Sequence, residues 1–427
     1  MSTPDLSPSS RLHALDGLRA AMMLLGLVLH SACNYQHTPA DAAWGFRDAR
    51  THEFFSFVVS FIHAWRMPIF MFISGFFSAL LVERRGAEGF LANRIARLGI
   101  PFAIFLPLTL PLTTSGFYFA NVFRFSGSVE AGFERYSIDM MGSLFPPITI
   151  HLWFLYYLIL YCLISFMLLH LGHKLLPKKI RTLPTKIIGT IMRVPGGTIL
   201  LCIPLACTLK NSAGLLVTGL LFVPELTSFL SYGILFLCGW AFWSHRSLLE
   251  NLRSWPRTIF CIVLTLLLYP IWMEFFLQWV GLPPGQVTAA LCKILAVESL
   301  ERSTILWLGA SISTLMIWSA IWGFLGLFLL ITSRDIPLIR YLVDGSYWVY
   351  LIHLPFTIWI PGLIANVELG AFSKFFITLS VTTVVGFISY DLLVRNTVLG
   401  EILNGRRWPR ALGRALRNRS LLPEQGQ

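Results

Sequence analysis

Residues 18–35 read LRAAMMLLGLVLHSACNY, an apolar stretch long enough to cross a bilayer, with a histidine, His30, inside it. A helix of about 20 such residues spans a hydrocarbon core about 30 Å thick. At about 1.5 Å of rise per residue, His30 lies about 16 Å beyond Arg19, near the middle of that core. An ionisable side chain at this depth is costly unless it faces a polar cavity, so His30 is the first candidate functional residue.

Comparable apolar stretches follow along the whole chain of 427 residues. Hydrophobic residues make up 56% of it and charged residues only 13%, about half the charged share of a soluble domain. A backbone in lipid must satisfy its own hydrogen bonds, and these stretches are too long for barrel strands. The sequence therefore predicts an all-α polytopic membrane protein with about ten transmembrane helices, at 18–36, 54–82, 98–120, 150–172, 197–213, 224–244, 256–280, 304–332, 341–365 and 371–394.

The basic residues are distributed unevenly over the segments between these spans. If the N-terminus is cytoplasmic, most of the 33 lysines and arginines lie on the cytoplasmic side, as the positive-inside rule requires. The net charge of +12 is therefore attributed to topology and not to binding of nucleic acid. This arrangement predicts two cytoplasmic termini, an N-terminal segment 1–17, a single membrane domain 18–394 and a basic tail 395–427. The basic segment 173–196 is expected to be flexible.

The first polar cluster precedes His30 on the same predicted helix. Arg11, Asp16 and Arg19 lie before it, on a rough common face that continues toward the imidazole. Because an imidazole titrates near neutral pH, His30 is suited to general base catalysis. The alternative is a charged cap followed by one core histidine whose hydrogen bonds are satisfied.

A second cluster contains Arg94 and Arg97, three positions apart at the start of the third span. Residues at this spacing share one face of an α-helix, and two guanidinium groups there can grip a diphosphate or a 3′-phosphate. The alternative is ordinary positive-inside anchoring.

The second span carries His63 and Arg66 among apolar residues, followed by Pro68, which can open the helix and widen a cavity. Arg66 at this depth is as costly as His30. The alternative is that Arg66 snorkels or has a structural partner.

Two further clusters are expected toward the outer side of the membrane. His151 and Trp153 open the fourth span, where an aromatic belt accounts for the tryptophan but not for the histidine. The ninth span carries Tyr347 and His353, the latter close to Pro355. The seven cysteines lie in apolar stretches without paired spacing, so no metal site is expected.

Taken in order, these motifs resemble the acyltransferase 3 superfamily of multi-span membrane enzymes. The chain is most similar to the glucan biosynthesis protein C branch, which succinylates osmoregulated periplasmic glucans. The motifs that carry the resemblance are LDGLR at 15–19 with His30, HAWRMPIF at 63–70, SGFFS at 74–78, RIARLGIP at 94–101, HLWFL at 151–155 and SYWVYLIHLP at 346–355.

The resemblance implies a multi-pass inner-membrane O-acyltransferase. Its donor substrate is a cytoplasmic acyl-CoA, its acceptor is a glycan hydroxyl on the periplasmic side, and the acyl group is succinyl or acetyl. No bound cofactor is expected. Membrane lipids are expected as partners, and the oligomeric state is left open, as is the choice between direct transfer and an acyl-enzyme.

The resemblance also assigns expected roles to the site residues. It makes His30 the leading catalytic residue and associates Arg94 and Arg97 with the acyl donor. The other expected roles are donor binding for Arg19 and Arg11, donor positioning for Asp16, oxyanion stabilisation for Arg66 with His63, and acceptor binding for His151, Trp153, His353 and Tyr347.

A transporter or flippase for a glycan or a lipid-linked precursor is the rival hypothesis. The buried histidines and arginines would then form a substrate or proton pathway. No internal repeat of the kind found in many transporters is visible in the sequence.

Overall fold

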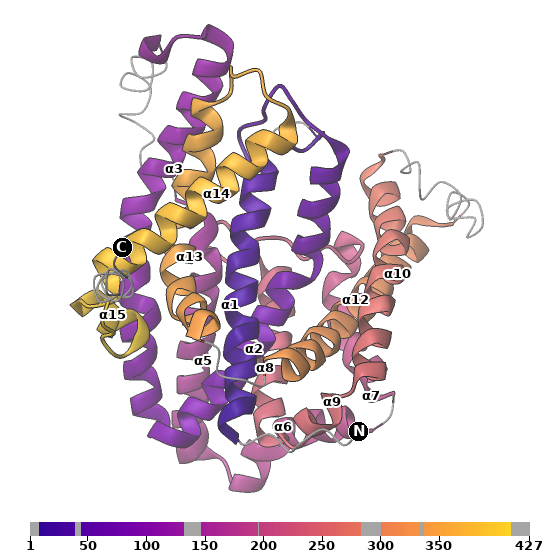
Figure 1. Ribbon diagram of the computed structural model, residues 1–427. Coiled ribbons are helices and arrows are strands. Elements are labelled where there is room, and N and C mark those ends of the chain that lie inside the picture. Colours follow the sequence, from indigo (N-terminus) through magenta and orange to yellow (C-terminus); the bar gives the residue numbers. More distant parts are fainter. Residues whose placement is uncertain are drawn as a thin grey trace, which may run out of the picture. The chain divides into compact units, whose positions relative to one another are not determined.

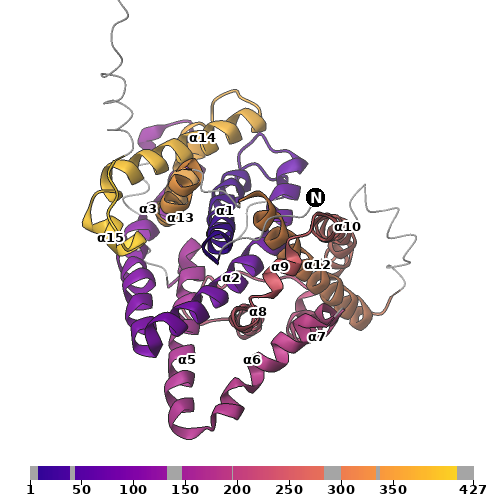
Figure 2. The same ribbon diagram turned by 60° about the horizontal axis from the view of Figure 1, so that its bottom comes forward.

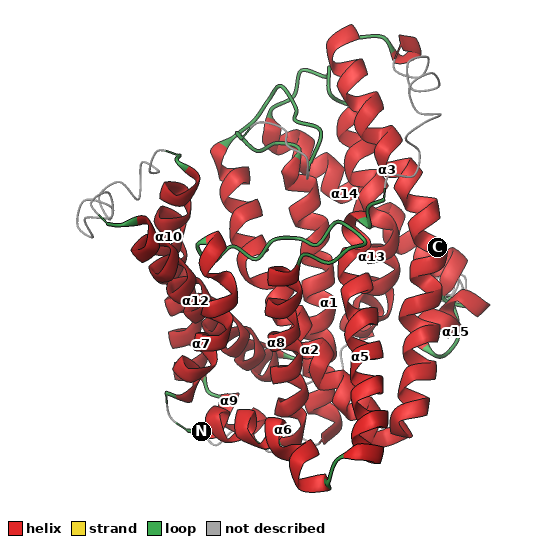
Figure 3. Ribbon diagram, turned by 180° about the vertical axis from the view of Figure 1, so that it is seen from behind, coloured by secondary structure: helices red, strands yellow, loops and turns green. Residues whose placement is uncertain are grey.

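The computed structural model describes residues 8–38, 44–131, 147–194, 196–282, 300–332 and 337–410. Figures 1 and 3 show that these residues form helices joined by loops, and within them the only pairing of extended backbone is an isolated bridge between Ile148 and Leu221. The predicted all-α class is thus confirmed. The chain divides into two compact units, which are described separately. Unit 1 comprises Met1–Met22, Ser60–Leu98 and Pro147–Ile336, and unit 2 comprises Met23–Val59, Gly99–Pro146 and Pro337–Gln427.

Unit 1 contains the first part of α1 and most of α2. Its helices are α1 (Pro8–Cys33), α2 (Glu53–Arg94), η1 (Ile95–Gly99), η3 (Ile150–Leu152), α5 (Trp153–Leu175), α6 (Lys178–Arg193), α7 (Gly197–Leu209), η4 (Lys210–Ser212), α8 (Leu226–Ser244), α9 (Leu248–Leu252), α10 (Trp255–Val280) and α12 (Arg302–Ile331). The helix α6 corrects the expectation of a flexible segment at 173–196.

Two glycines allow α2 and α8 to approach closely inside unit 1. A Cβ atom on Gly75 would lie 1.9 Å from the carbonyl oxygen of Phe236, and one on Gly239 would lie 1.8 Å from that of Phe72. In lipid, small residues permit this backbone approach, and the packing it allows holds helices together. The pair therefore fixes how α2 packs on α8.

Unit 2 contains the second part of α1, the start of α2 and the last helices of the chain. The latter are α13 (Pro337–Leu363), α14 (Ala371–Ser389), η6 (Tyr390–Val394) and α15 (Val398–Asn404), and they are joined by α3 (Ile100–Ser126). Trp359 on α13 donates its indole N–H to the carbonyl of Leu112 on α3 at 2.8 Å. The same indole covers Gly116, where a Cβ would lie 2.9 Å from the ring. These contacts pack α13 along α3.

Several helices are suited to crossing a membrane. Among the described residues, the stretches that are long and apolar enough are Leu12–Cys33, Glu53–Ser126, Ile150–Leu175, Leu226–Ser244, Trp255–Val280, Arg302–Ile331 and Ala371–Val394. Glu53–Ser126 runs through α2, η1 and α3 and contains two of the predicted spans. The predicted spans at 197–213 and 341–365 fall on α7 and α13, which are not in this set. The count of about ten and the cytoplasmic termini stay predictions.

Candidate active site

His30 lies between two other rings in unit 2. Its imidazole stacks on the indole of Trp44, with ring centroids 5.3 Å apart and an angle of 13° between the planes. On α13, the ring of His353 lies at 5.3 Å and is tilted by 38°. Both neighbours are buried, and His30 is partly buried. The structure thus brings together two of the predicted site residues, His30 and His353, and adds Trp44, for which no role was predicted.

The tautomer of His353 follows from its hydrogen bond. Its Nδ1 lies 2.7 Å from the carbonyl oxygen of Tyr350. A carbonyl can only accept, so Nδ1 carries the proton, and in the neutral ring the lone pair is on Nε2. The ring therefore presents a proton acceptor at Nε2.

Asn34 connects Trp44 to α13. Its side-chain oxygen accepts the indole N–H of Trp44 at 3.1 Å, and its Nδ2 donates to the carbonyl of Thr357 at 2.9 Å. Asn34 is fully buried. Because a buried amide that loses its partners costs about 1–3 kcal/mol, this bridge fixes the indole where it stacks on His30.

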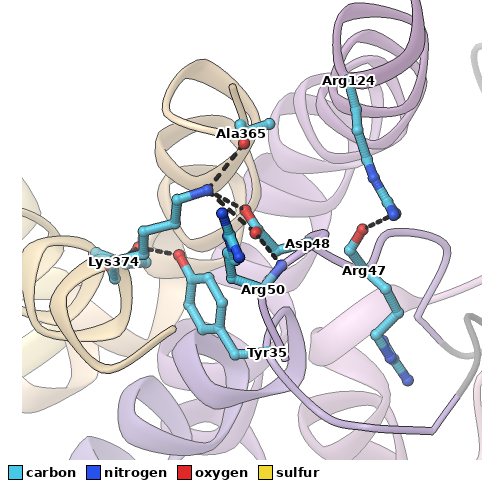
Figure 4. A network of polar contacts seen from close by, with 8 residues as sticks. Tyr35, Arg47, Asp48, Arg50, Arg124, Ala365 and Lys374 are labelled. Atoms are coloured by element: carbon cyan, nitrogen blue, oxygen red, sulfur yellow. Dashed lines mark hydrogen bonds and ion pairs between the residues drawn. The ribbon is translucent and has the colours of Figure 1, made fainter. Parts of the chain in front are cut away.

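The segment that carries Trp44 is fixed by a buried ion pair (Figure 4). Lys374 on α14 donates to both carboxylate oxygens of Asp48, at 3.1 and 2.9 Å, and to the carbonyl of Ala365 at 2.8 Å. The exposed fractions of the two side chains are 1% and 0%. The backbone N–H of Asp48 donates to the carbonyl of Asn34 at 2.8 Å, so one backbone hydrogen bond joins the ion pair to the amide bridge.

Further contacts from α3 and α14 hold the same region. Arg124 donates to the carbonyl of Arg47 (Figure 4). Asn121 donates to that of Gly45 at 2.8 Å. Tyr35 is hydrogen-bonded to Thr378 at 3.1 Å. The loop before α2 is therefore tied to two helices of unit 2, which pre-organises the ring beside His30.

The other predicted catalytic residues lie in unit 1. Arg66 donates to the carbonyl of Met22 at 3.4 Å, which gives it one structural partner of the kind considered above. His63 has its Nε2 3.3 Å from the carbonyl of Leu216 and must donate there. Both contacts are made to backbone oxygens, so the two side chains are positioned by the fold of unit 1.

Asp16 forms an ion pair with Arg19. Their side chains are 3.0 Å apart in α1 and both are partly exposed. Arg19 also lies over the ring of Phe77, 5.3 Å from the centroid. Arg11 is part of α1, but its side chain lies outside the described residues.

Arg94 and Arg97 flank a change in helix type. Arg94 ends α2 and lies over Phe90 at 5.7 Å, whereas Arg97 is inside the π-helical turn η1. A π turn holds more residues than an α turn, so three residues fall further short of a full turn. The two side chains are therefore separated by a wider angle than on the predicted single α-helix. Such turns are frequent at functional sites.

The predicted acceptor residues divide between the units. In unit 1, His151 and Trp153 are buried, and Trp153 packs against Tyr232 with centroids 5.3 Å apart. Ile150, just before them, has φ at 43°, an unusual value for a β-branched residue.

In unit 2, Tyr347 begins a row of rings on α13. Tyr347 and Tyr350 are 6.4 Å apart, and Tyr350 and His353 are 6.1 Å apart. With His30 and Trp44, this row consists of five rings.

The chain matches the acyltransferase family Acyl_transf_3, described as an acyltransferase domain, over residues 12–391, and it belongs to that family. The chain therefore carries an acyltransferase domain, and the transporter alternative is not favoured. The chain is 32% identical over 153 residues to Glucans biosynthesis protein C of Escherichia coli strain K12, and 32% identical over the same length to that of strain O1:K1 / APEC. The matched stretch covers 36% of this chain and 37% of each relative. No solved structure matches the chain significantly.

Proposed function

We propose that this acyltransferase moves a succinyl or acetyl group from a cytoplasmic acyl-CoA to hydroxyl groups of a periplasmic or cell-surface glycan, at the inner membrane. Osmoregulated periplasmic glucan is the first candidate acceptor, because the relatives carry the name Glucans biosynthesis protein C. The observation that carries the proposal is the imidazole of His30, held between Trp44 and His353.

In the direct form of the reaction, His30 accepts the proton of the acceptor hydroxyl while the hydroxyl oxygen attacks the thioester carbonyl carbon. The tetrahedral intermediate collapses, the carbon–sulfur bond breaks, and the proton passes from His30 to the thiolate of CoA. The products are a glycan ester and free CoA. His353 lies in the same site and can assist this step. Its Nδ1–H donates to Tyr350, so in the neutral ring the lone pair is on Nε2, which can accept a proton.

The remaining charged residues fit the donor. Arg94 and Arg97 would bind the phosphates of CoA, together with Arg19, whose guanidinium Asp16 orients. Arg11 joins the donor side from the first turns of α1.

Arg66 with His63 would stabilise the oxyanion of the intermediate, where a fixed positive charge in a dry site has its largest effect. Trp153 and His151 are proposed on the acceptor side together with Tyr347.

Mass spectrometry of periplasmic and surface glycans tests this proposal. The strains are the wild type, a deletion, and the deletion expressing the intact protein, His30→Ala or His170→Ala, the last at an exposed histidine on α5. We expect the glycan to persist in all strains and to lose one acyl substituent in the deletion and in His30→Ala only. The mass difference identifies the acyl group. Acylation at the normal level in His30→Ala, or a glycan that accumulates inside the deletion cells, contradicts the proposal.

A further inference from the structure

The helix α6 begins where a membrane-crossing helix ends. α5 ends at Leu175 and α6 starts at Lys178, so only residues 176 and 177 separate them. Extended chain advances at most about 3.6 Å per residue, so α6 starts within about 11 Å of the point where α5 ends. Figure 2 shows α6 turning sharply away from the axis of α5. Because α5 is long and apolar enough to cross a membrane, α6 begins near one end of a candidate membrane span.

One face of α6 rests on the ends of its neighbours in unit 1. Gly189 lies directly against the ring of His245, where a Cβ would come within 2.0 Å. His245 follows the last residue of α8 and donates from Nδ1 to the carbonyl of Ala241 at 3.1 Å. Arg181 packs on Gly172 near the end of α5, at 3.4 Å from a Cβ placed there. These contacts fix which faces of α6 point outward.

A second face is apolar and uncovered. Ile180, Leu183 and Ile187 follow the spacing of one helical stripe and are 51%, 51% and 50% exposed. Leu176 and Val194, which flank α6 in the sequence, are similarly exposed. Apolar area left in water forgoes about 25 cal/mol per Å², whereas the acyl boundary of a bilayer would bury it.

A third face is basic and borders the apolar stripe. Lys179, Lys186 and Arg193 are seven positions apart, are all exposed, and two of them directly precede Ile180 and Ile187. Among the described residues, none of the three cations has an ion-pair partner. An apolar stripe with a basic edge is the pattern of a helix that lies in the plane of a membrane.

We propose that α6 is an interfacial helix that binds anionic phospholipid. The apolar stripe of Ile180, Leu183 and Ile187 enters the boundary of the acyl chains, and Lys179, Lys186 and Arg193 contact headgroup phosphates. The partner is a lipid and not an acidic protein because α6 leaves the bilayer so close to the end of α5. This inference is independent of the acyl transfer proposed above.

Thermal unfolding of the full-length protein in a neutral detergent tests the inference. Phosphatidylglycerol or phosphatidylcholine with the same acyl chains is titrated in, and the midpoint Tm is followed by tryptophan fluorescence. We expect phosphatidylglycerol to raise Tm at the lower concentration. A basic residue near an anionic surface contributes about 1 kcal/mol, which is about fivefold in affinity. The variant K179Q/K186Q/R193Q should therefore need on the order of a hundredfold more phosphatidylglycerol for the same rise.

Three comparisons make the test specific to α6. The variant R406Q/R407Q/R410Q removes three cations from the segment after α15 and should respond as the wild type does. The charge-preserving variant K179R/K186R/R193K should also respond normally. The single variant Lys186→Gln, at an exposed position that packing does not need, should shift the titration about fivefold. Equal responses to the two lipids in the wild type, or a larger loss in the R406Q/R407Q/R410Q variant than in the α6 variant, would overturn the proposal.

Discussion

The indole of Trp44 donates its N–H to the side-chain oxygen of Asn34 at 3.1 Å while its face lies on the imidazole of His30. One amide therefore controls the orientation of the ring that covers the candidate base. Asn34 also donates to Thr357 on α13, the helix that carries His353, so the orientation of the indole depends on the position of that helix. The indole of Trp44 and the imidazoles of His30 and His353 are therefore held together as one cluster.

Substitutions of Trp44 separate its two contacts. Trp44→Phe keeps a ring against His30 but removes the N–H bond to Asn34, and Trp44→Ala removes both. An aromatic contact contributes about 0.5–1.5 kcal/mol, or about 2- to 10-fold in rate if it positions the base. We expect kcat to decrease from wild type to Trp44→Phe to Trp44→Ala, measured as acyl transfer by purified protein. Trp255→Ala, at an exposed tryptophan, is the control, and a wild-type kcat in Trp44→Ala would remove this role.

His353→Gln tests the second imidazole. The amide of glutamine can still donate to Tyr350, but it cannot accept and release a proton near neutral pH. General acid–base groups contribute about 10²–10⁴-fold, so we expect kcat to fall toward that range while KM for acyl-CoA changes little. His170→Gln serves as the matched control, and an unchanged kcat in His353→Gln would assign the residue to packing alone.

The Asp48–Lys374 pair predicts a stability effect. Lys374→Met or Asp48→Asn leaves a buried group without its partner, which costs about 3–5 kcal/mol. Both variants should unfold at clearly lower temperature in detergent. The double variant D48L/K374M should recover much of the loss, since it leaves no buried charge.

The exposed pair of Glu401 and Arg407, 3.1 Å apart, is the matched comparison. Glu401→Gln should change stability by at most about 1 kcal/mol. Equal losses of stability in Asp48→Asn and Glu401→Gln would show that the buried pair stabilises the fold no more than an exposed pair does.

Gly239→Ala tests the close approach of α2 and α8. The added methyl would collide with the carbonyl of Phe72, a backbone atom that can move only with its helix. We expect little folded protein by size-exclusion chromatography of the detergent extract. Gly233→Ala on the same helix places its Cβ 3.4 Å from Tyr161 and should give a normal yield. If both variants behave alike, the approach is looser than described.

The helices could be predicted from the sequence because long apolar runs must be helical in lipid. His30 was identifiable for a related reason, the cost of a titratable group within such a run. Lys374, inside the predicted span 371–394, carried the same signal, but its partner Asp48 is 326 positions away and no local pattern connects them. Trp44 was inaccessible to sequence reasoning for the same reason, since only tertiary folding places it on His30.

The segment 173–196 shows a different kind of error. Its many basic residues suggested a flexible loop, yet Ile180, Leu183 and Ile187 already had helical spacing. In this segment, periodicity is a better guide to helix formation than composition. The spacing of Arg94 and Arg97 predicts a shared face only on an ideal α-helix, and the side-chain pattern does not reveal the π turn that follows Arg94.

The ammonium group of Lys374 has all three of its protons engaged, by Asp48 and Ala365, and is 1% exposed. An amine-directed acylating reagent needs the neutral, accessible amine, so it can modify this lysine only after unit 2 opens locally. Peptide mass spectrometry can compare the labelling rate of Lys374 with that of the exposed Lys179. The difference between the two rates reports how often the region around His30 opens.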